Sequence, residues 1–303
     1  MIEQSTTTPG VGVASGTFSP RVGARQTIGR IWRFIFLGAT SLAIVLLLML
    51  LYSIVEPGWS WLSWNLITNA PSRNPEIAGM NPAIWGSIWI VLGSGIVAFV
   101  MGLGTAIYLE EYAGRGKFMD FIHMNISNLA GVPSIVYGLL GLVLFVEWMN
   151  IGRSLIAGAL TMALLILPVV VISSREAIRA VPSSLREASY GLGATRWQTV
   201  KNHVLPAAMP GILTGIILAM SRAIGETAPL LVVGGASQVL WRPESPFSTF
   251  MVMPLQIYNW TGRPQKEFEH LAAAAIIVLM VILLLMNSLA IGLRQHFSKK
   301  ARW

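Results

Sequence analysis

Six long apolar segments, nearly free of charge, constrain the fold of this chain more than any other feature. They are residues 34–55, 83–109, 121–146, 154–174, 210–235 and 271–293. A helix needs about 20 apolar residues to cross the hydrocarbon core of a bilayer, and each segment is long enough. The pattern therefore predicts an all-α, polytopic membrane protein with six transmembrane helices embedded in a lipid bilayer.

The chain is predicted to have two parts. Residues 1–32 begin with a stretch that is rich in Ser, Thr, Gly and Pro and poor in aliphatic side chains, which is typical of a disordered tail. Residues 33–303 then form the six-span domain. The first apolar segment is too long for the core of a secretion signal, and no small-residue cleavage site follows it, so we expect it to remain as an anchor.

The distribution of Lys and Arg predicts the orientation. If residue 1 lies inside, 15 of the 21 basic residues fall in cytoplasmic segments and 5 in outer loops, which favours both termini in the cytoplasm. These cations form no single patch with interleaved aromatic residues, so the net charge of +8 does not indicate nucleic-acid binding. The chain has no Cys, which excludes disulfide and thiol chemistry.

Two features between the termini leave alternatives open. Pro133 interrupts the third segment in the sequence GVPSIVYGLLG, residues 131–141. The glycines of this stretch favour tight helix packing. Alternatively, an unwound backbone at Pro133 could line a pathway. The outer loop 236–270 is unusually long, and it could form an interfacial helix or a contact surface for an external partner.

The polar cytoplasmic segment 181–206 predicts two short helices. Ser184 and Glu187 have the spacing of a capping box, and Thr195 and Gln198 repeat it. The first helix is expected to end at the turn 191–193 and the second at His203. The two short helices would present four side chains to a groove of a soluble partner protein. These are Leu185, Ala188, Tyr190 and Trp197. The plainer alternative is a connecting loop that Glu187 merely caps.

This segment, called here the EAA-like loop (residues 181–206), resembles the EAA loop of type I ABC importer permeases. That motif has the spacing EAA, three residues, Gly, nine residues, Ile, one residue, Leu-Pro. The matching positions are Glu187, Ala188, Ser189, Gly193, Leu205 and Pro206. Ser189 stands where the motif has Ala, and His203 stands at the Ile position. The resemblance implies a permease whose loop docks on a separate ATPase dimer.

The chain itself lacks a phosphate-binding loop of the form G-x-x-x-x-G-K-[ST]. We therefore expect a non-catalytic subunit without a cofactor or metal of its own, with ATP and Mg²⁺ bound by the partner ATPase.

Arg222 and Glu226 are the charged residues of the fifth segment. On a helical wheel they share a face with Gly215 and Ala219, within about 60°. Charges in a span cost about 2.5 to 3.5 kcal/mol on insertion scales and normally face a partner or an aqueous cavity. The pair could neutralise itself and hold the bundle together. Alternatively, the guanidinium fork could bind an oxyanion, while the carboxylate accepts a hydrogen bond from protonated phosphate and repels fully deprotonated sulfate.

Three stretches together resemble the permeases of phosphate-specific ABC importers, and the third is similar to their A-type subunit. They are GVPSIVYGL (131–139), REASYGLGATRW (186–197) and SRAIGETAPLL (221–231). The resemblance runs from the second span onward. It implies a bacterial plasma-membrane complex with a second, C-type permease, an ATPase dimer and an extracytoplasmic phosphate-binding protein, and it puts Arg222 and Glu226 on the path of inorganic phosphate.

Three other functions remain possible at this stage. A permease of the same architecture could carry sulfate or molybdate. A secondary transporter could use Glu226 as a proton relay, but it would be expected to contain inverted repeats with paired broken helices, and the sequence has one EAA-like loop and one charged span. A scaffold without transport would leave the intramembrane Arg222 unexplained.

Overall fold

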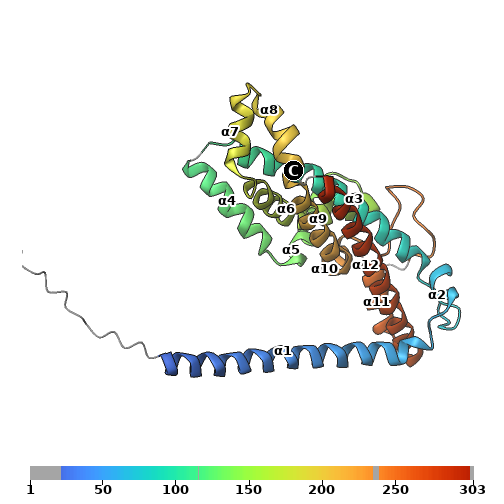
Figure 1. The fold of residues 1–303 in the computed structure, drawn as a ribbon. Coiled ribbons are helices and arrows are strands. Elements are labelled where there is room, and N and C mark those ends of the chain that lie inside the picture. Colours follow the sequence, from blue (N-terminus) through green and yellow to red (C-terminus); the bar gives the residue numbers. More distant parts are fainter. Residues whose placement is uncertain (1–21, 115, 235–238, 301–303) are drawn as a thin grey trace, which may run out of the picture. The chain divides into compact units, whose positions relative to one another are not determined.

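The computed structural model of the protein describes residues 22–114, 116–234 and 239–300, and every regular element in these ranges is a helix (Figure 1). Five helical segments are long and apolar enough to cross a membrane, and a sixth crosses it if one bent pair of helices counts as a single span. The predicted all-α, membrane-spanning fold class is confirmed. The chain divides into two compact units, residues 1–52 and 53–303.

In the first unit, the described residues belong to helix α1 (Val22–Trp59), which continues into the second unit. The structure is helical from Val22, inside the predicted tail segment 1–32, while residues 1–21 lie outside the described residues. No Pro stands between Val22 and the apolar run, so nothing in the sequence stops the helix from extending beyond it. Residues 34–55 of α1 are its apolar part, which is long enough to cross a membrane.

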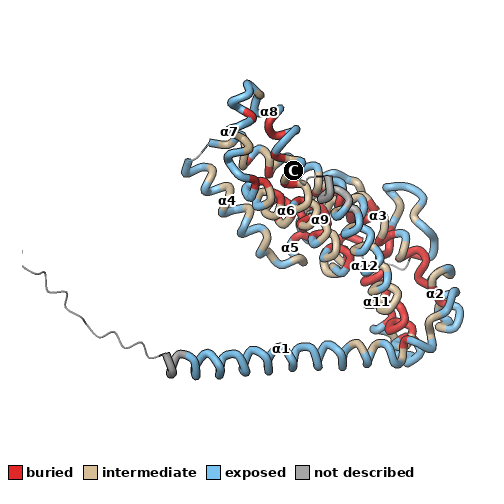
Figure 2. Tube along the Cα trace, in the orientation of Figure 1, coloured by how far each residue is buried: buried red, intermediate tan, exposed pale blue. Residues whose placement is uncertain are grey.

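The second unit is built around three helices. They are α3 (Asn81–Ile107), α6 (Leu155–Arg179) and α9 (Leu205–Gly225), with α6 packed against both others. Helix α3 continues through a π-helical turn, η1 (Tyr108–Tyr112). Helix α2 (Trp64–Thr68) precedes α3 on the chain, and the long helix α12 (Lys266–Lys300) packs against α9. Figure 2 shows how burial concentrates where these helices meet.

The predicted third span is broken. Helix α4 (Lys117–Ala130) is bent by 100° relative to the segment formed by α5 (Ser134–Gly141) and the π-helical turn η2 (Leu142–Trp148). Pro133 explains the break, because it offers no backbone N–H and disfavours helical geometry at the residue before it. The Tyr137 hydroxyl donates to the carbonyl of Leu129 at 2.8 Å, which satisfies one of the carbonyls at the end of α4.

The predicted fifth span, residues 210–235, is also two pieces. Helix α9 ends at Gly225, Glu226 is extended (φ −79°, ψ 119°), and helix α10 (Ala228–Gly234) follows. Pro229 suits the first turn of a new helix, whereas inside a continuous helix it would leave the carbonyl of Gly225 without its hydrogen bond. The wheel used to group Arg222 with Glu226 therefore does not hold beyond Gly225.

The two broken spans pack against each other. Helix α10 lies along α5, and a methyl group at Gly138 would come within 2.8 Å of Cα of Pro229. A methyl group at Gly102 would likewise lie 2.7 Å from Cγ1 of Val170, between α3 and α6. At these positions the glycines permit close helix approach, as the tight-packing interpretation predicts.

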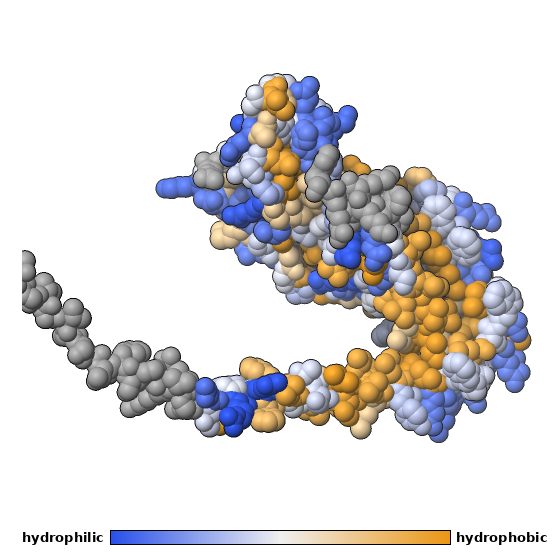
Figure 3. Space-filling view, viewed as in Figure 1, coloured by the Kyte–Doolittle hydropathy of each residue, from blue (hydrophilic) through white to orange (hydrophobic). Residues whose placement is uncertain are grey.

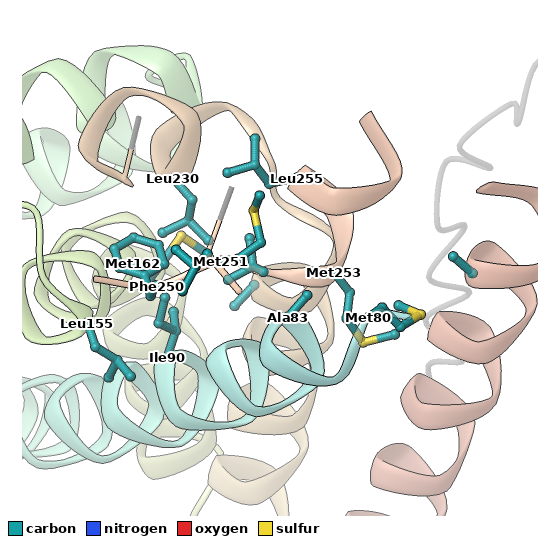
Figure 4. Packing of buried hydrophobic residues seen from close by; sticks show 14 of the residues in the cluster. Met80, Ala83, Ile90, Leu155, Met162, Leu230, Phe250, Met251, Met253 and Leu255 are labelled. Atoms are coloured by element: carbon teal, nitrogen blue, oxygen red, sulfur yellow. The ribbon is translucent and has the colours of Figure 1, made fainter. Parts of the chain in front are cut away.

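The outer loop folds back into the core. Phe250 and Met251 are buried near Ile90 and Met162, and Met253 is buried near Met80 (Figure 4). Helix α11 (Met253–Thr261) continues this buried segment. Helix α12 begins at Lys266, so the described part of the loop is shorter than predicted. Residues 235–238 lie outside the described residues. The loop is long because it packs its apolar stretch into the core of its own chain.

Candidate functional site: the EAA-like loop and the Arg222–Glu226 pair

The EAA-like loop forms a helical hairpin from helix α7 (Ser183–Gly191) and helix α8 (Arg196–Thr199). The predicted capping box at Thr195 and Gln198 is present, with both reciprocal hydrogen bonds. The one predicted at Ser184 and Glu187 is wrong, because the N-cap position is held by Pro182, two residues before Ser184, without a side-chain hydrogen bond. A proline before the helix fixes the entry of the chain, so a side-chain cap is not required there.

The second short helix does not end at His203. Helix α8 runs through a π-helical turn, η3 (Val200–Val204), directly into α9, and Pro206 lies in the first turn of α9. Pro206 has no backbone N–H to donate to the carbonyl four residues earlier, and the π-helical turn just before it replaces the ordinary i to i−4 hydrogen bonds there. The loop is therefore joined rigidly to the fifth span on its C-terminal side.

The tip of the hairpin exposes apolar side chains. Leu192 is 91% exposed, and Tyr190 and Trp197 are also exposed. Figure 3 shows hydrophobic surface at the tip formed by α7 and α8. Glu187 and Ala188 lie on the exposed side of α7, and Glu187 has no ion-pair partner among the described residues. Leu185 differs from the prediction, because it packs against the chain's own core. An exposed apolar tip beside a free carboxylate is typical of a protein interface.

Ser189 and Gly193 hold the hairpin in shape. The Ser189 hydroxyl lies 2.9 Å from the hydroxyl of Thr199, in a buried hydrogen bond between α7 and α8. Gly193 has φ +81°, a conformation that favours glycine, and so allows the turn between the helices. The Ser at the motif's second Ala position thus links the two helices. His203, at the motif's Ile position, is exposed and does not enter the core of this chain.

The base of the hairpin rests on a small apolar core at the ends of the spans nearest to it. Its buried members are Ala106, Ile178, Val181, Val204, Ala208 and Ile212. Leu205 of the motif is half-buried against the same core, whereas Pro206 is exposed. Helices α3, α6 and α9 all contribute, so the hairpin is mounted on three spans at once.

Two ion pairs join η1 to α6 and to α7 at this end of the bundle. Nη2 of Arg175 lies 2.8 Å from Oε1 of Glu110, and Nη2 of Arg186 lies 2.8 Å from Oε1 of Glu111. All four side chains are largely shielded from solvent. The two carboxylates are not among the site residues predicted from the sequence. Their position directly after an apolar span, in a region otherwise rich in arginine, is the signal that could have indicated pairing.

Arg222 and Glu226 form the second candidate site. Nε of Arg222 donates to Oε1 of Glu226 at 3.2 Å, across the end of helix α9. The predicted pairing is present, but Glu226 lies outside the helix. Gly215 and Ala219, which precede Arg222 on α9, are buried in the bundle. The small residues of the predicted face therefore pack inside, whereas the two charged residues lie at the end of the helix.

The Arg222 side chain remains half-exposed, at 50%, against 20% for Glu226. Among the described residues, the terminal nitrogens of Arg222 have no hydrogen-bond partner, so the pair leaves most of the guanidinium donors available. No cluster of His, Asp and Glu among the described residues could hold a metal ion. The arrangement is thus suited to binding an oxyanion through N–H donors.

Comparison with known proteins agrees with this architecture. A family model for the binding-protein-dependent transport system inner membrane component matches residues 98–303. The chain is 34% identical over 254 residues to the phosphate transport system permease protein PstA 1 of Mycobacterium tuberculosis (strain CDC 1551 / Oshkosh), covering 82% of each chain. It is 34% identical over 257 residues to PstA of Yersinia pestis, covering 84% of each. It is 37% identical over 223 residues to the probable ABC transporter permease protein YqgI of Bacillus subtilis (strain 168), covering 73% of this chain and 75% of that protein.

Solved structures share the fold. A chain of a bacterial alginate ABC transporter in complex with its alginate pentasaccharide-bound periplasmic protein matches with a TM-score of 0.63 and 16% identity, covering 88% of this chain and 94% of that chain. A chain of the inward-facing MetNI methionine ABC transporter matches with a TM-score of 0.59 and 16% identity, covering 71% and 94%. From the family match and the identity to its relatives, the chain belongs to the binding-protein-dependent transport system inner membrane component family, as a multi-pass ABC transporter permease.

Proposed function

We propose that this chain is the A-type permease subunit of an ATP-driven importer of inorganic phosphate, and that it forms half of the translocation pathway. The observation that carries the proposal is the Arg222–Glu226 pair at the broken end of α9, with the outer guanidinium nitrogens free of partners among the described residues. The PstA proteins to which the chain is similar are phosphate transport permeases by name.

The proposed chemistry follows from the two side chains. The guanidinium of Arg222 offers a planar fork of N–H donors that matches two oxygens of a phosphate. The Glu226 carboxylate accepts a hydrogen bond from a protonated phosphate oxygen and repels an anion that carries no proton. A site of this kind binds phosphate in preference to sulfate or molybdate.

The break at Glu226 and the break at Pro133 belong to the same proposed pathway. Helices α10 and α5, which follow the two breaks, pack directly against each other. Irregular backbone inside a membrane protein is tolerated where it is enclosed by protein or lines a water-filled cavity. Two adjacent breaks beside a charged pair therefore favour an aqueous passage at this point of the bundle.

The EAA-like loop is the proposed dock for the partner ATPase dimer, which binds ATP and Mg²⁺. Its motif positions divide into an exposed group for docking, Glu187, Ala188, Gly193 and Pro206, and a shielded group that shapes the hairpin, Ser189 and Leu205. A second, C-type permease and an extracytoplasmic phosphate-binding protein complete the complex. The loop faces the cytoplasm in this proposal, together with both chain termini.

Transport assays with the purified complex in proteoliposomes test the proposed substrate and energy source. Labelled phosphate uptake should require ATP inside and the binding protein outside, and excess sulfate or molybdate should leave it unchanged. Equal inhibition by sulfate would contradict the phosphate assignment. Uptake that follows an ion gradient without ATP would contradict the ATP-driven mechanism.

A further inference from the structure

Arg186 lies where three parts of the inner membrane face meet. From helix α7, its Nε and Nη2 donate to Oε1 of Glu111 at 3.0 and 2.8 Å, at the end of the α3–η1 segment. Its Nη2 also donates to the carbonyl of Ile178 in the last turn of α6, at 2.9 Å, and its Nη1 donates to the carbonyl of Val181 at 2.7 Å. One guanidinium therefore connects the docking hairpin to two spans.

The Arg186–Glu111 ion pair is largely shielded from solvent. The Glu111 side chain is 5% exposed and that of Arg186 is 19% exposed, so water screens the pair far less than a surface ion pair. Removing either partner would leave a shielded charge uncompensated. The fork of Arg186 is engaged on all three nitrogens, and a Lys could not reproduce this geometry.

The Ser189–Thr199 hydrogen bond adds a second link on the other side of the hairpin, between α7 and α8, and α8 continues into α9. Helix α7 is thus tied to α3 and α6 through Arg186, and to α9 through α8. The link through Arg186 consists of side-chain hydrogen bonds, whereas the link to α9 is continuous backbone beyond Thr199.

We propose that Arg186 is a positioning residue that makes α7 move as one body with the inner ends of α3 and α6. Displacement of α7 by the ATPase then reaches both spans. This inference rests on the proposed role of the EAA-like loop as the ATPase dock. Without the contact to Glu111, α7 tilts on its own, and ATP is hydrolysed with less movement of the spans.

The neighbouring pair supplies a matched control. Arg175 and Glu110 join the same two segments, α6 and η1, at the same 2.8 Å distance, but they do not bond to α7. Loss of this pair weakens the contact between the two spans and leaves the link to α7 in place. A comparison of Glu111→Ala with Glu110→Ala therefore separates the connection to α7 from general stability.

The first measurement is the amount of phosphate moved per ATP hydrolysed by the complete complex in proteoliposomes. Glu111→Ala should lower this ratio about tenfold, as expected from the loss of a hydrogen bond to a charged group. Glu111→Gln keeps an acceptor oxygen and should give an intermediate ratio, while Glu110→Ala should keep the wild-type ratio. If the Glu111→Ala complex does not assemble, the test uses the ratio of phosphate moved to ATP hydrolysed by the Glu111→Gln complex. A wild-type ratio in that variant would overturn the proposal. So would equal losses in the Glu110→Ala and Glu111→Ala variants, or a fall of uptake and ATPase activity together at constant ratio.

A second measurement is independent of phosphate. The chain has no Cys, so spin labels at Met101→Cys in α3 and Ser184→Cys in α7 report one defined distance in the assembled complex. On addition of ATP, the distance distribution should stay narrow in the otherwise unchanged chain and with Glu110→Ala, and broaden with Glu111→Ala. An unchanged width with Glu111→Ala would overturn the proposed link. A wild-type complex that moves no phosphate would instead overturn the proposed function, and the spin labels would still decide the role of Arg186.

Discussion

The guanidinium Nε of Arg222 lies 3.2 Å from the carboxylate Oε1 of Glu226, although the helix that carries Arg222 ends at Gly225. The pair therefore closes across a helix end and does not run along one face of a continuous helix. Arg222 also lies in the last turn of α9, where a positive charge is favoured by the helix dipole. The pair is thus held in place by the end of α9 while its outer donors stay accessible.

Replacing Glu226 by Gln should weaken the discrimination between oxyanions. Gln keeps the size of the side chain and removes the charge that repels fully deprotonated sulfate. The sulfate concentration needed to inhibit labelled phosphate uptake should fall about tenfold, so that an excess without effect on the unchanged protein becomes inhibitory. This corresponds to about 1.4 kcal/mol, within the range for a unit-charge pair near a protein surface. Glu244→Gln, in the outer loop, is the control. Unchanged sulfate inhibition in Glu226→Gln would argue that the carboxylate does not contact the anion.

Reversing the charge of Glu187 should uncouple the permease from its ATPase. Glu187 is exposed on α7 and has no ion-pair partner among the described residues, so Glu187→Lys leaves the fold of this chain intact. We expect loss of the ATPase from the purified complex and loss of ATP-driven uptake. Glu176→Lys, at an exposed site near the inner end of α6, should have neither effect. Normal assembly and uptake with Glu187→Lys would rule out the proposed dock.

The Ser189–Thr199 hydrogen bond can be tested with a double substitution. Ser189→Ala restores the residue of the EAA motif but leaves the Thr199 hydroxyl buried without a partner, which should cost about 1 to 3 kcal/mol. Adding Thr199→Val replaces that hydroxyl with a methyl group and should recover most of the loss. Thermal unfolding of the purified complex, followed by tryptophan fluorescence, measures both variants. A double variant as unstable as Ser189→Ala alone would show that the hydroxyl pair does not stabilise the hairpin.

The contact between the broken spans should be sensitive to a single methyl group. Gly138→Ala would place Cβ at 2.8 Å from the backbone of Pro229, so α5 and α10 must separate. Overpacking of this kind typically costs about 1 to 3 kcal/mol. At Gly104, apart from the neighbouring backbone of its own helix, no atom of the described residues lies within 4 Å of the added Cβ. Gly104→Ala should therefore change stability by only about 0.5 kcal/mol in the same unfolding assay, as surface substitutions usually do.

Much of this architecture could be predicted from the sequence, because lipid imposes strong rules. The apolar segments gave helices, and the spacing of Thr195 and Gln198 gave a capping box that is present. The pairing of Arg222 with Glu226 followed from the cost of a lone charge inside a span. These features depend on local chemistry or on solvent, and both can be evaluated without knowing which helices are neighbours.

The errors arose where long-range packing decides the local structure. Pro206 was expected to end a helix, and instead a π-helical turn carries the helix past it. The fifth span was expected to continue through Glu226, and instead it breaks so that α10 can pack against α5. Glu111 was not singled out, because its partner Arg186 lies far along the chain and meets it only after the spans have packed.

The most direct test of the central claim is labelled phosphate uptake by cells that carry Arg222→Gln, with subunit association checked by co-purification from the same membranes. Gln removes the charge and the guanidinium fork while keeping a shorter, uncharged polar side chain. Arg179→Gln, at an exposed position in the last turn of α6, is the control and should behave as wild type. We predict that Arg222→Gln abolishes uptake while the complex stays assembled. Normal uptake would contradict the account, because Arg222 would then lie off the path of the anion.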